Sequence, residues 1–95
     1  MAYKKVWLSG YLGYNLENNR YGFLVSDLWE NDGFHCGEGN LQVRVDGKWV
    51  KTTMEMDWST GCGVWYLTGT PYRGDDLEHL RSRYYTTIDK DYYDL

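Results

Sequence analysis

The chain is poor in the residue types on which metal chemistry depends. Its 95 residues include only 2 Cys and 2 His. Structural zinc sites use paired ligands at spacings of roughly two to four residues, and Cys36 and Cys62 stand far apart. His35 is adjacent to Cys36, so on an extended backbone the two side chains point to opposite faces. We therefore expect no metal site and no cofactor.

A recognisable catalytic constellation is also missing. A cysteine nucleophile needs a base and a group that orients it, and nothing in the sequence places Cys36 beside His79. The stretches "GYLGY" and "GTPYRGDD" lack the Lys-Ser/Thr of a phosphate-binding loop. We therefore predict no enzyme activity and no catalytic residues. The stretch "GFHCGEGN" is interpreted as a glycine-rich turn in which Cys36 is a small buried residue.

Long apolar runs and an excess of basic residues are lacking as well. No run approaches the roughly 18 apolar residues of a membrane span, and the N-terminal stretch lacks the apolar run of a signal peptide. We expect a cytoplasmic protein with reduced thiols and no membrane partner. A net charge of −4 argues against binding that depends on neutralising phosphates. Nucleic acid is therefore the weakest of the candidate partners.

What the chain does contain is typical of a folded domain with many tight turns. Hydrophobic residues make up 42% and aromatic residues 18%, and there are 11 Gly against 1 Pro. The length is enough for one modest core. We expect a single β-rich domain over residues 1–88, followed by an acidic tail over residues 89–95, "DKDYYDL".

The clearest element is a β-hairpin in "LQVRVDGKWVKTTMEM", residues 41–56. Apolar and polar residues alternate before and after Asp46-Gly47, a dipeptide that favours the positive φ angles of a two-residue turn. The turn fixes the register and predicts the pairs Val45–Lys48, Arg44–Trp49, Val43–Val50 and Leu41–Thr52. The inward row is then Leu41, Val43, Val45, Val50, Met54 and Met56.

The same register predicts an outward row that surrounds Trp49. Arg44, Gln42 and Lys51 share this face, and a guanidinium over the indole is worth about 0.5–1 kcal/mol. An outward Trp is a candidate contact residue. The alternative is that a loop or a terminal segment covers it.

Four further segments complete the predicted fold. "KKVWLSGYL" and "NRYGFLVSDLW" are expected to be strands joined by the turn "NLENN", and "GVWYLTG" to be a central strand. In "RGDDLEHLRSRYYTTI" we favour one helical turn at residues 75–80, capped by Asp75 or Asp76, and then a closing strand. The fold class is mostly β: a small SH3-like barrel of five to six short antiparallel strands, with a helical turn before the last one. The alternative is an α+β domain with one C-terminal helix packed on an antiparallel sheet.

Several of these stretches together resemble a known family. "LSGYLGYNLENNRYGFLVSDLW", "GFHCGEGNLQVRVDGKWVKTTMEM", "WYLTG" and "GDDLEHLRSR" are similar to the DUF5348 group of small uncharacterised Firmicutes proteins, many of them carried on mobile elements. The resemblance covers roughly residues 6–85. It implies a stand-alone β-rich domain in a bacterial or phage setting and carries no catalytic motif.

The remaining signal is aromatic, with 10 Tyr and 5 Trp in one small domain. Tyr, Trp and Arg dominate the energetics of protein interfaces. The leading hypothesis is a non-catalytic module that binds a host protein, such as one of a defence system. The alternative is a small-ligand binder for a nucleotide or signalling molecule, with Arg73, Arg81 and Arg83 as phosphate contacts. Single-stranded nucleic-acid binding is the weakest hypothesis, since aromatic platforms are present but no basic groove is evident.

Overall fold

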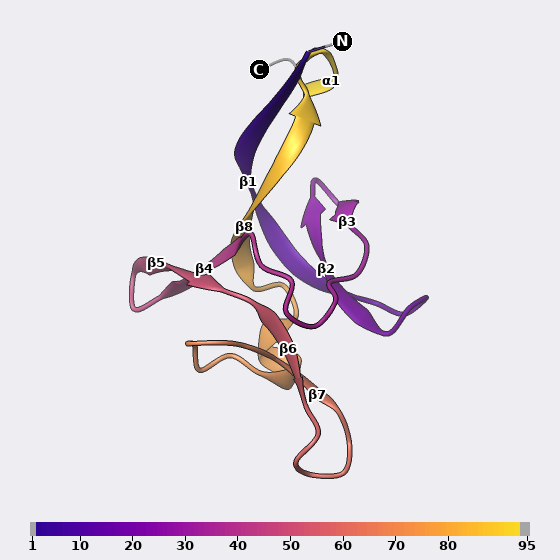
Figure 1. Ribbon diagram of the computed structural model, residues 1–95, viewed down its shortest axis with the longest axis vertical. Helices are drawn as coiled ribbons and strands as arrows, with labels where there is room; N and C mark the ends of the chain where they lie inside the picture. The colour runs from indigo at the N-terminus through magenta and orange to yellow at the C-terminus, as the bar shows by residue number, and fades with distance from the viewer. Residues whose placement is uncertain (1, 94–95) are drawn as a thin grey trace.

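The structure is a computed structural model that describes residues 2–93, and it contains two antiparallel sheets (Figure 1). Six strands form the main sheet in the order β3-β2-β1-β8-β4-β5, and β6 pairs with β7 alone. The elements are β1 (Tyr3–Asn15), β2 (Arg20–Val25), β3 (Leu28–Asn31), β4 (Leu41–Val45), β5 (Lys48–Thr52), β6 (Met54–Asp57), β7 (Val64–Leu67), the 3₁₀ turn η1 (Gly74–Leu77), β8 (Arg81–Asp89) and α1 (Lys90–Tyr93).

The β4–β5 hairpin has the predicted register, but it ends at Thr52 rather than at residue 56, because Met54–Asp57 forms β6 and pairs with β7. Asp46 and Gly47 adopt φ angles of 50° and 79°, the left-handed conformations that a two-residue turn of this kind requires. Arg44 lies opposite Trp49, and Leu41 lies opposite Thr52. The local turn chemistry alone therefore decides which side chains of this hairpin share a face.

The longest pairing joins strands from opposite ends of the chain. The first part of β1 pairs with β8, from Tyr3–Asp89 to Tyr11–Arg81. The last part of β1 pairs with β2. Figure 1 shows the outer part of β1 and β8 extending as a two-stranded ribbon beyond the other strands. At its tip the Lys90 amide donates a hydrogen bond of 2.9 Å to the Ala2 carbonyl.

One face of the main sheet, here called the inner face, carries the core. Leu12 and Phe23 lie opposite each other on β1 and β2, and both are fully buried. Strands β2 and β4 add further buried side chains to this face, and the β6–β7 hairpin, the connection before β4 and η1 supply the rest. The core comprises Leu12, Tyr21, Phe23, Phe34, Leu41, Val43, Met54, Trp65, Leu67 and Leu77.

Tyr21 links this core to η1. Its hydroxyl donates a hydrogen bond of 3.1 Å to the Gly74 carbonyl, which tethers the 3₁₀ turn to β2. Burial raises the pKa of the Tyr21 phenol, and the nearby carboxylates of Glu78 and Asp75 raise it further. The phenol therefore stays protonated and remains a donor over the ordinary pH range.

The mostly β, antiparallel class predicted from the sequence is confirmed, and so is the helical turn before the last strand. Asp76 caps that turn, because its carboxylate accepts a hydrogen bond of 3.2 Å from the Arg73 amide. The alternative of an α+β domain with one C-terminal helix packed on the sheet is wrong, since β8 occupies Arg81–Asp89 and the helix that follows it, α1, has only 4 residues.

The predicted barrel does not close. The edge strands of the described sheet are β3 and β5, at opposite ends of the strand order. "GVWYLTG" was expected to be a central strand, but it forms β7 and pairs with β6 in a separate sheet. The chain therefore uses residues 54–67 to cover the inner face, and among residues 2–93 no strand joins β5 to β3.

Three smaller expectations are also corrected or extended. The segment 19–29 is not one strand, because Ser26 and Asp27 turn the chain at φ angles of 51° and 63° between β2 and β3. Cys36 lies in the predicted turn, yet it is exposed, as is Cys62. The predicted acidic tail begins within β8 and α1, and its residues 94 and 95 lie outside the described residues.

Candidate binding surface

The outer face of the main sheet collects cations and aromatic rings from four strands. On β1 and β8, Trp7 lies opposite Tyr85, so the two rings share this face. Arg83 lies two residues from Tyr85, on the same side of β8, and opposite Gln42 of β4. The β4–β8 pairing thereby joins the predicted outward row of the hairpin to the ribbon.

Arg83 lies at the centre of this surface. The centre of its guanidinium is 4.5 Å from the Trp49 ring centroid and 5.3 Å from the Trp7 ring centroid. Its Nε donates a hydrogen bond of 2.6 Å to Oε1 of Gln42. One arginine therefore touches rings from β1 and β5 and an amide from β4.

Further contacts extend the row on both sides of Arg83. The Arg44 guanidinium lies 5.2 Å from the Trp49 centroid, and the Trp7 and Tyr85 centroids are 5.0 Å apart. Each exposed cation–π contact is worth about 0.5–1 kcal/mol. We call this row the cation–aromatic ladder. Its members, in spatial order, are Arg44, Trp49, Arg83, Trp7, Tyr85 and Lys5, the ammonium of Lys5 lying 6.0 Å from the Tyr85 centroid.

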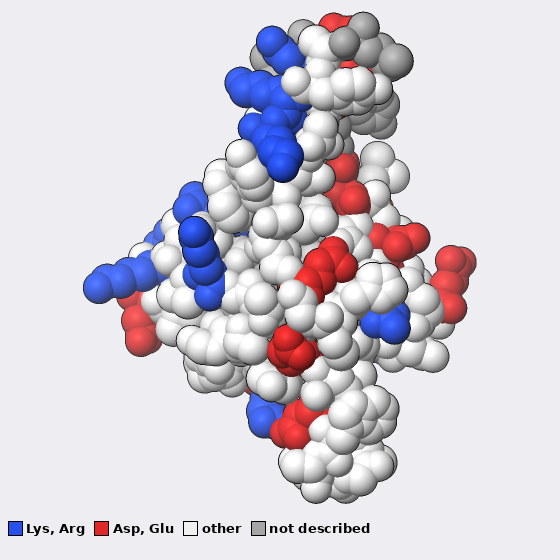
Figure 2. Space-filling model, in the orientation of Figure 1, with Lys and Arg blue, Asp and Glu red and all other residues white. Residues whose placement is uncertain are grey.

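Charge is distributed unevenly over the molecule. Figure 2 shows Lys and Arg gathered over the ribbon and the β4–β5 hairpin, and most Asp and Glu on the remainder of that view. The outward rows of β1, β8, β4 and β5 hold the cations Lys5, Arg44, Lys51, Arg81 and Arg83, with Asp89 as an acidic residue at the far end of the ribbon. A protein of net charge −4 thus presents a locally cationic surface.

Trp29 extends the aromatic surface across β1, β2 and β3. Gly13 and Gly22 face each other beneath it. A Cβ atom at Gly13 would lie 2.6 Å from the Leu24 Cδ1 atom and 3.5 Å from the Trp29 ring. The absence of side chains at this glycine pair lets the indole lie close to the sheet, where 39% of Trp29 remains exposed.

The structure brings some of the predicted site residues together. Arg44, Trp49, Gln42, Lys51 and Arg83 all belong to the outer face. Gln42, however, is buried rather than solvated, because the Arg83 side chain lies against it. Trp49 is half-buried, and the Arg44 and Arg83 guanidiniums lie over its ring.

The three predicted phosphate contacts do not form one group. Arg81 is exposed and lies opposite Tyr11 on the outer face. Arg73 lies near the second sheet, where its Nη2 atom forms an ion pair of 2.9 Å with Asp57. The Ser59 amide and the Arg73 guanidinium donate hydrogen bonds to the Asp57 carboxylate, which lowers its pKa to about 2. Arg73 is thus engaged in an ion pair that links β6 to the segment before η1.

Lys5, Trp7 and Tyr85 were missed as site residues. Their signal is the period-two alternation in "KKVWLSGY" and "RSRYYTT", which places cations and rings on one side of each strand. The alternation does not reveal which strands are neighbours. Only the β1–β8 and β4–β8 pairings bring these rows beside Trp49.

Within residues 2–93 there is no group of three or more His, Cys, Asp and Glu side chains able to hold a metal ion. No helix in that range has the length and apolar character needed to cross a bilayer.

Fold and surface together define a small antiparallel β domain with one cationic aromatic sheet face. The family model described as a domain of unknown function, DUF5348, matches residues 10–84. The chain therefore belongs to the DUF5348 family. Neither curated proteins nor solved structures give a match. Arg44, Trp49 and Arg83 lie within the matched residues, whereas Lys5, Trp7 and Tyr85 lie outside them.

Proposed function

We propose that this protein is a non-catalytic binding module that docks an acidic surface of a partner protein onto the cation–aromatic ladder. The observation that carries the proposal is the placement of Arg83 between Trp49 and Trp7. Trp and Arg are the residue types that most often anchor protein interfaces. Rings and guanidiniums that already hold one another lose less conformational entropy when a partner arrives. Charge complementarity points to an acidic partner.

A protein partner fits the ladder better than single-stranded nucleic acid. Nucleobases stack on free ring faces. The Trp49 ring already has the guanidiniums of Arg44 and Arg83 within 5.2 Å and 4.5 Å of its centroid. The overall charge of −4 also opposes a long phosphate chain beyond the local cationic patch.

The biological setting is part of the proposal and rests on the family resemblance alone. We propose that the chain is encoded on a mobile element or phage of Firmicutes and acts in the cytoplasm. Its partner would be a host protein, and a component of a defence system is the candidate we favour. Occupying an acidic surface of that protein would block it without any chemical step.

The test is affinity capture from a bacterial lysate, followed by binding measurements with the purified partner. Trp49→Ala should strongly reduce capture, whereas Trp58→Ala should not. Trp58 is a matched control because 67% of it is exposed and it lies beyond β6, outside the ladder. Affinity for the purified partner should fall as salt rises. Equal capture by the native chain and by Trp49→Ala would refute the proposal.

A further inference from the structure

A cleft lies where the outer face turns from the β4–β5 hairpin into the ribbon. Its volume is about 540 Å³, within the range of roughly 300–1,000 Å³ typical of small-molecule sites. We call it the corner cleft. It is lined by Trp7, Gly39, Asn40, Leu41, Lys51, Thr52, Thr53, Thr68 and Tyr85.

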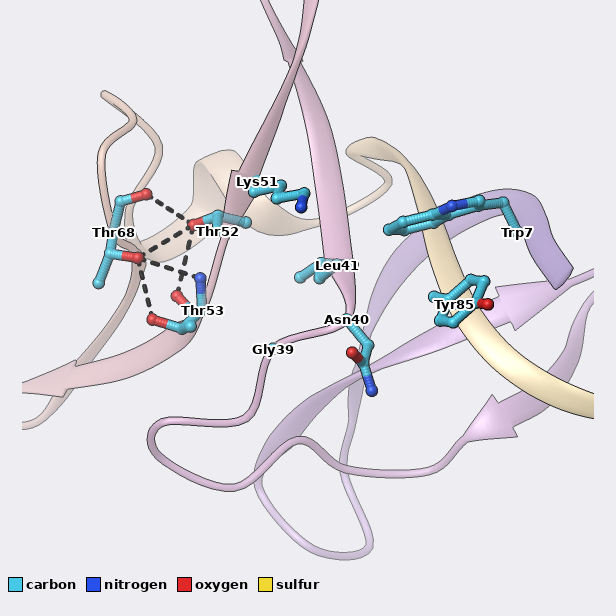
Figure 3. Close-up of a pocket in the computed structure, with 9 residues that line it drawn as sticks. All are labelled: Trp7, Gly39, Asn40, Leu41, Lys51, Thr52, Thr53, Thr68 and Tyr85. Atoms are coloured by element: carbon cyan, nitrogen blue, oxygen red, sulfur yellow. Dashed lines mark hydrogen bonds between the residues drawn. The ribbon is translucent and has the colours of Figure 1, made fainter. Parts of the chain in front are cut away.

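One side of the corner cleft is aromatic. Trp7 and Tyr85 hold each other at a centroid separation of 5.0 Å and an interplanar angle of 45°. Figure 3 shows the Trp7 indole extending across β8 toward Leu41 and Lys51, with the Tyr85 ring beside it. Since 39% of Trp7 is exposed, part of its ring surface is available to a ligand.

The opposite side is a threonine cluster held by its own hydrogen bonds. Thr52 Oγ1 donates to the Thr68 carbonyl at 2.7 Å, and the Thr53 amide donates to Thr68 Oγ1 at 3.0 Å. Thr53 Oγ1 lies 2.9 Å from Thr68 Oγ1 (Figure 3). These bonds fix one wall of the cleft and leave a polar edge on it.

Lys51 and Asn40 contribute unengaged polar groups to the lining. Within residues 2–93, the Lys51 ammonium makes no ion pair, and the Asn40 carboxamide makes no hydrogen bond. The nine lining residues include no carboxylate. The Arg83 guanidinium, 5.3 Å from the Trp7 centroid, adds positive charge beside the aromatic wall. The corner cleft therefore favours an anion that also carries a flat apolar group.

We propose that the corner cleft binds a nucleoside monophosphate, with its base against Trp7 and Tyr85 and its phosphate beside Lys51. A nucleobase offers a flat ring for stacking and an edge for the Asn40 carboxamide, which can both donate and accept hydrogen bonds. An ammonium without a carboxylate partner suits a phosphate. The same chemistry is presented by a free nucleotide and by the 5′-phosphorylated end of a strand.

The test titrates AMP into the protein and follows the indole resonance of Trp7 by NMR. AMP should bind at least about tenfold more tightly than adenosine or ribose 5-phosphate, since only AMP engages both the aromatic rings and Lys51. Lys51→Met should reduce the affinity for AMP to that for adenosine and leave adenosine binding unchanged. Trp7→Ala should weaken AMP and adenosine alike.

Lys48→Met is the matched control. Lys48 is an exposed lysine of the same strand, three positions from Lys51, so its side chain lies on the other side of β5. Lys48→Met should therefore leave AMP binding unchanged. Equal weakening by the two lysine variants, or AMP binding no tighter than its two fragments, would overturn the proposal.

A 5′-phosphorylated oligoadenylate distinguishes the two sources of the ligand. Affinity equal to that of AMP identifies the free nucleotide, and affinity at least about tenfold higher identifies a strand end. Both results keep the proposed site. The titration needs no protein partner, so this inference and the proposed docking function can fail separately.

Discussion

Tyr11 and Leu12 are neighbours on β1, yet Leu12 is fully buried whereas 52% of Tyr11 is exposed. Leu12 points to the inner face, where it lies opposite Phe23. Tyr11 points to the outer face, where it lies opposite Arg81. The alternation of a β-strand thus gives one set of strands two chemically opposite faces.

The two faces of the sheet therefore differ in whether their side chains determine folding stability or binding. The inner face excludes water with apolar side chains, which contribute most of the folding free energy. The outer face places rings and guanidiniums in contact with one another and leaves them accessible. Substitutions on the inner face should therefore unfold the protein, and substitutions on the outer face should change binding.

The largest effect is expected from the pair Leu12→Ala and Tyr11→Ala. Leu12→Ala should lower the free energy of unfolding by about 2–5 kcal/mol, because it opens a cavity in the core. Tyr11→Ala should change it by only about 0.5 kcal/mol. Urea unfolding of both variants measures the difference. Similar losses would show that the outer face is part of the stabilising core.

Trp49→Ala should separate stability from recognition. We expect a loss of about 2 kcal/mol in partner affinity, as for interface anchors. The cost in folding free energy should be about 1 kcal/mol, because arginine side chains rather than core residues cover the ring. Melting temperature and partner affinity are measured on the same variant. A stability loss of about 3–5 kcal/mol would instead identify Trp49 as a core residue.

A smaller effect is expected from the contact between Arg83 and Trp49. A double-mutant cycle with Arg83→Met and Trp49→Ala should give a coupling energy of about 0.5–1 kcal/mol in the isolated protein. Arg81 is a suitable control because it occupies the same row of β8 but forms no cation–π contact among the described residues. The cycle of Arg81→Met with Trp49→Ala should give a coupling near zero, and a larger value there would contradict the ladder geometry.

The smallest effect on stability is expected from Asp57, a residue of the β6–β7 hairpin that covers the inner face. This effect should depend on pH. The Asp57 pKa is lowered from 3.8 to about 2, so its carboxylate favours the folded state above the pKa of the unfolded chain. That contribution should disappear as the pH falls from about 4 to about 2. Asp57→Asn should melt below the native protein at pH 7, and the gap should close in acid. A gap that persists at pH 2 would refute the role of the carboxylate.

The hairpin and its outward row were predictable because the information is local. Asp46-Gly47 sets the turn, the turn sets the register, and the register places Arg44 opposite Trp49. The helical turn before the last strand was predictable for the same reason, since the Asp76 carboxylate accepts its hydrogen bond from the Arg73 amide, only three residues earlier. Interactions between residues close in sequence were therefore enough to predict the β4–β5 hairpin and η1.

The order of the strands was not predictable, because it depends on contacts between distant segments. Arg83 was grouped with Arg73 and Arg81 by composition, yet its neighbours are Gln42 and Trp49. Gln42 follows the polar half of an alternating pattern, and it is buried only because β8 pairs with β4. The open sheet was not predictable for the same reason, since no local sequence pattern indicates that β6 and β7 pair with each other outside the main sheet.

The pairing of β1 with β8 also governs how the protein assembles. Hairpins such as β4–β5 close short loops and form quickly, whereas β1 and β8 lie at opposite ends of the chain and must wait for the slow closure of a long loop. The cation–aromatic ladder takes Trp7 from the first strand, Arg83 from the last and Trp49 from the middle of the sequence. It therefore cannot exist on a partly folded or nascent chain. A partner that recognises the ladder would bind only molecules that have completed folding.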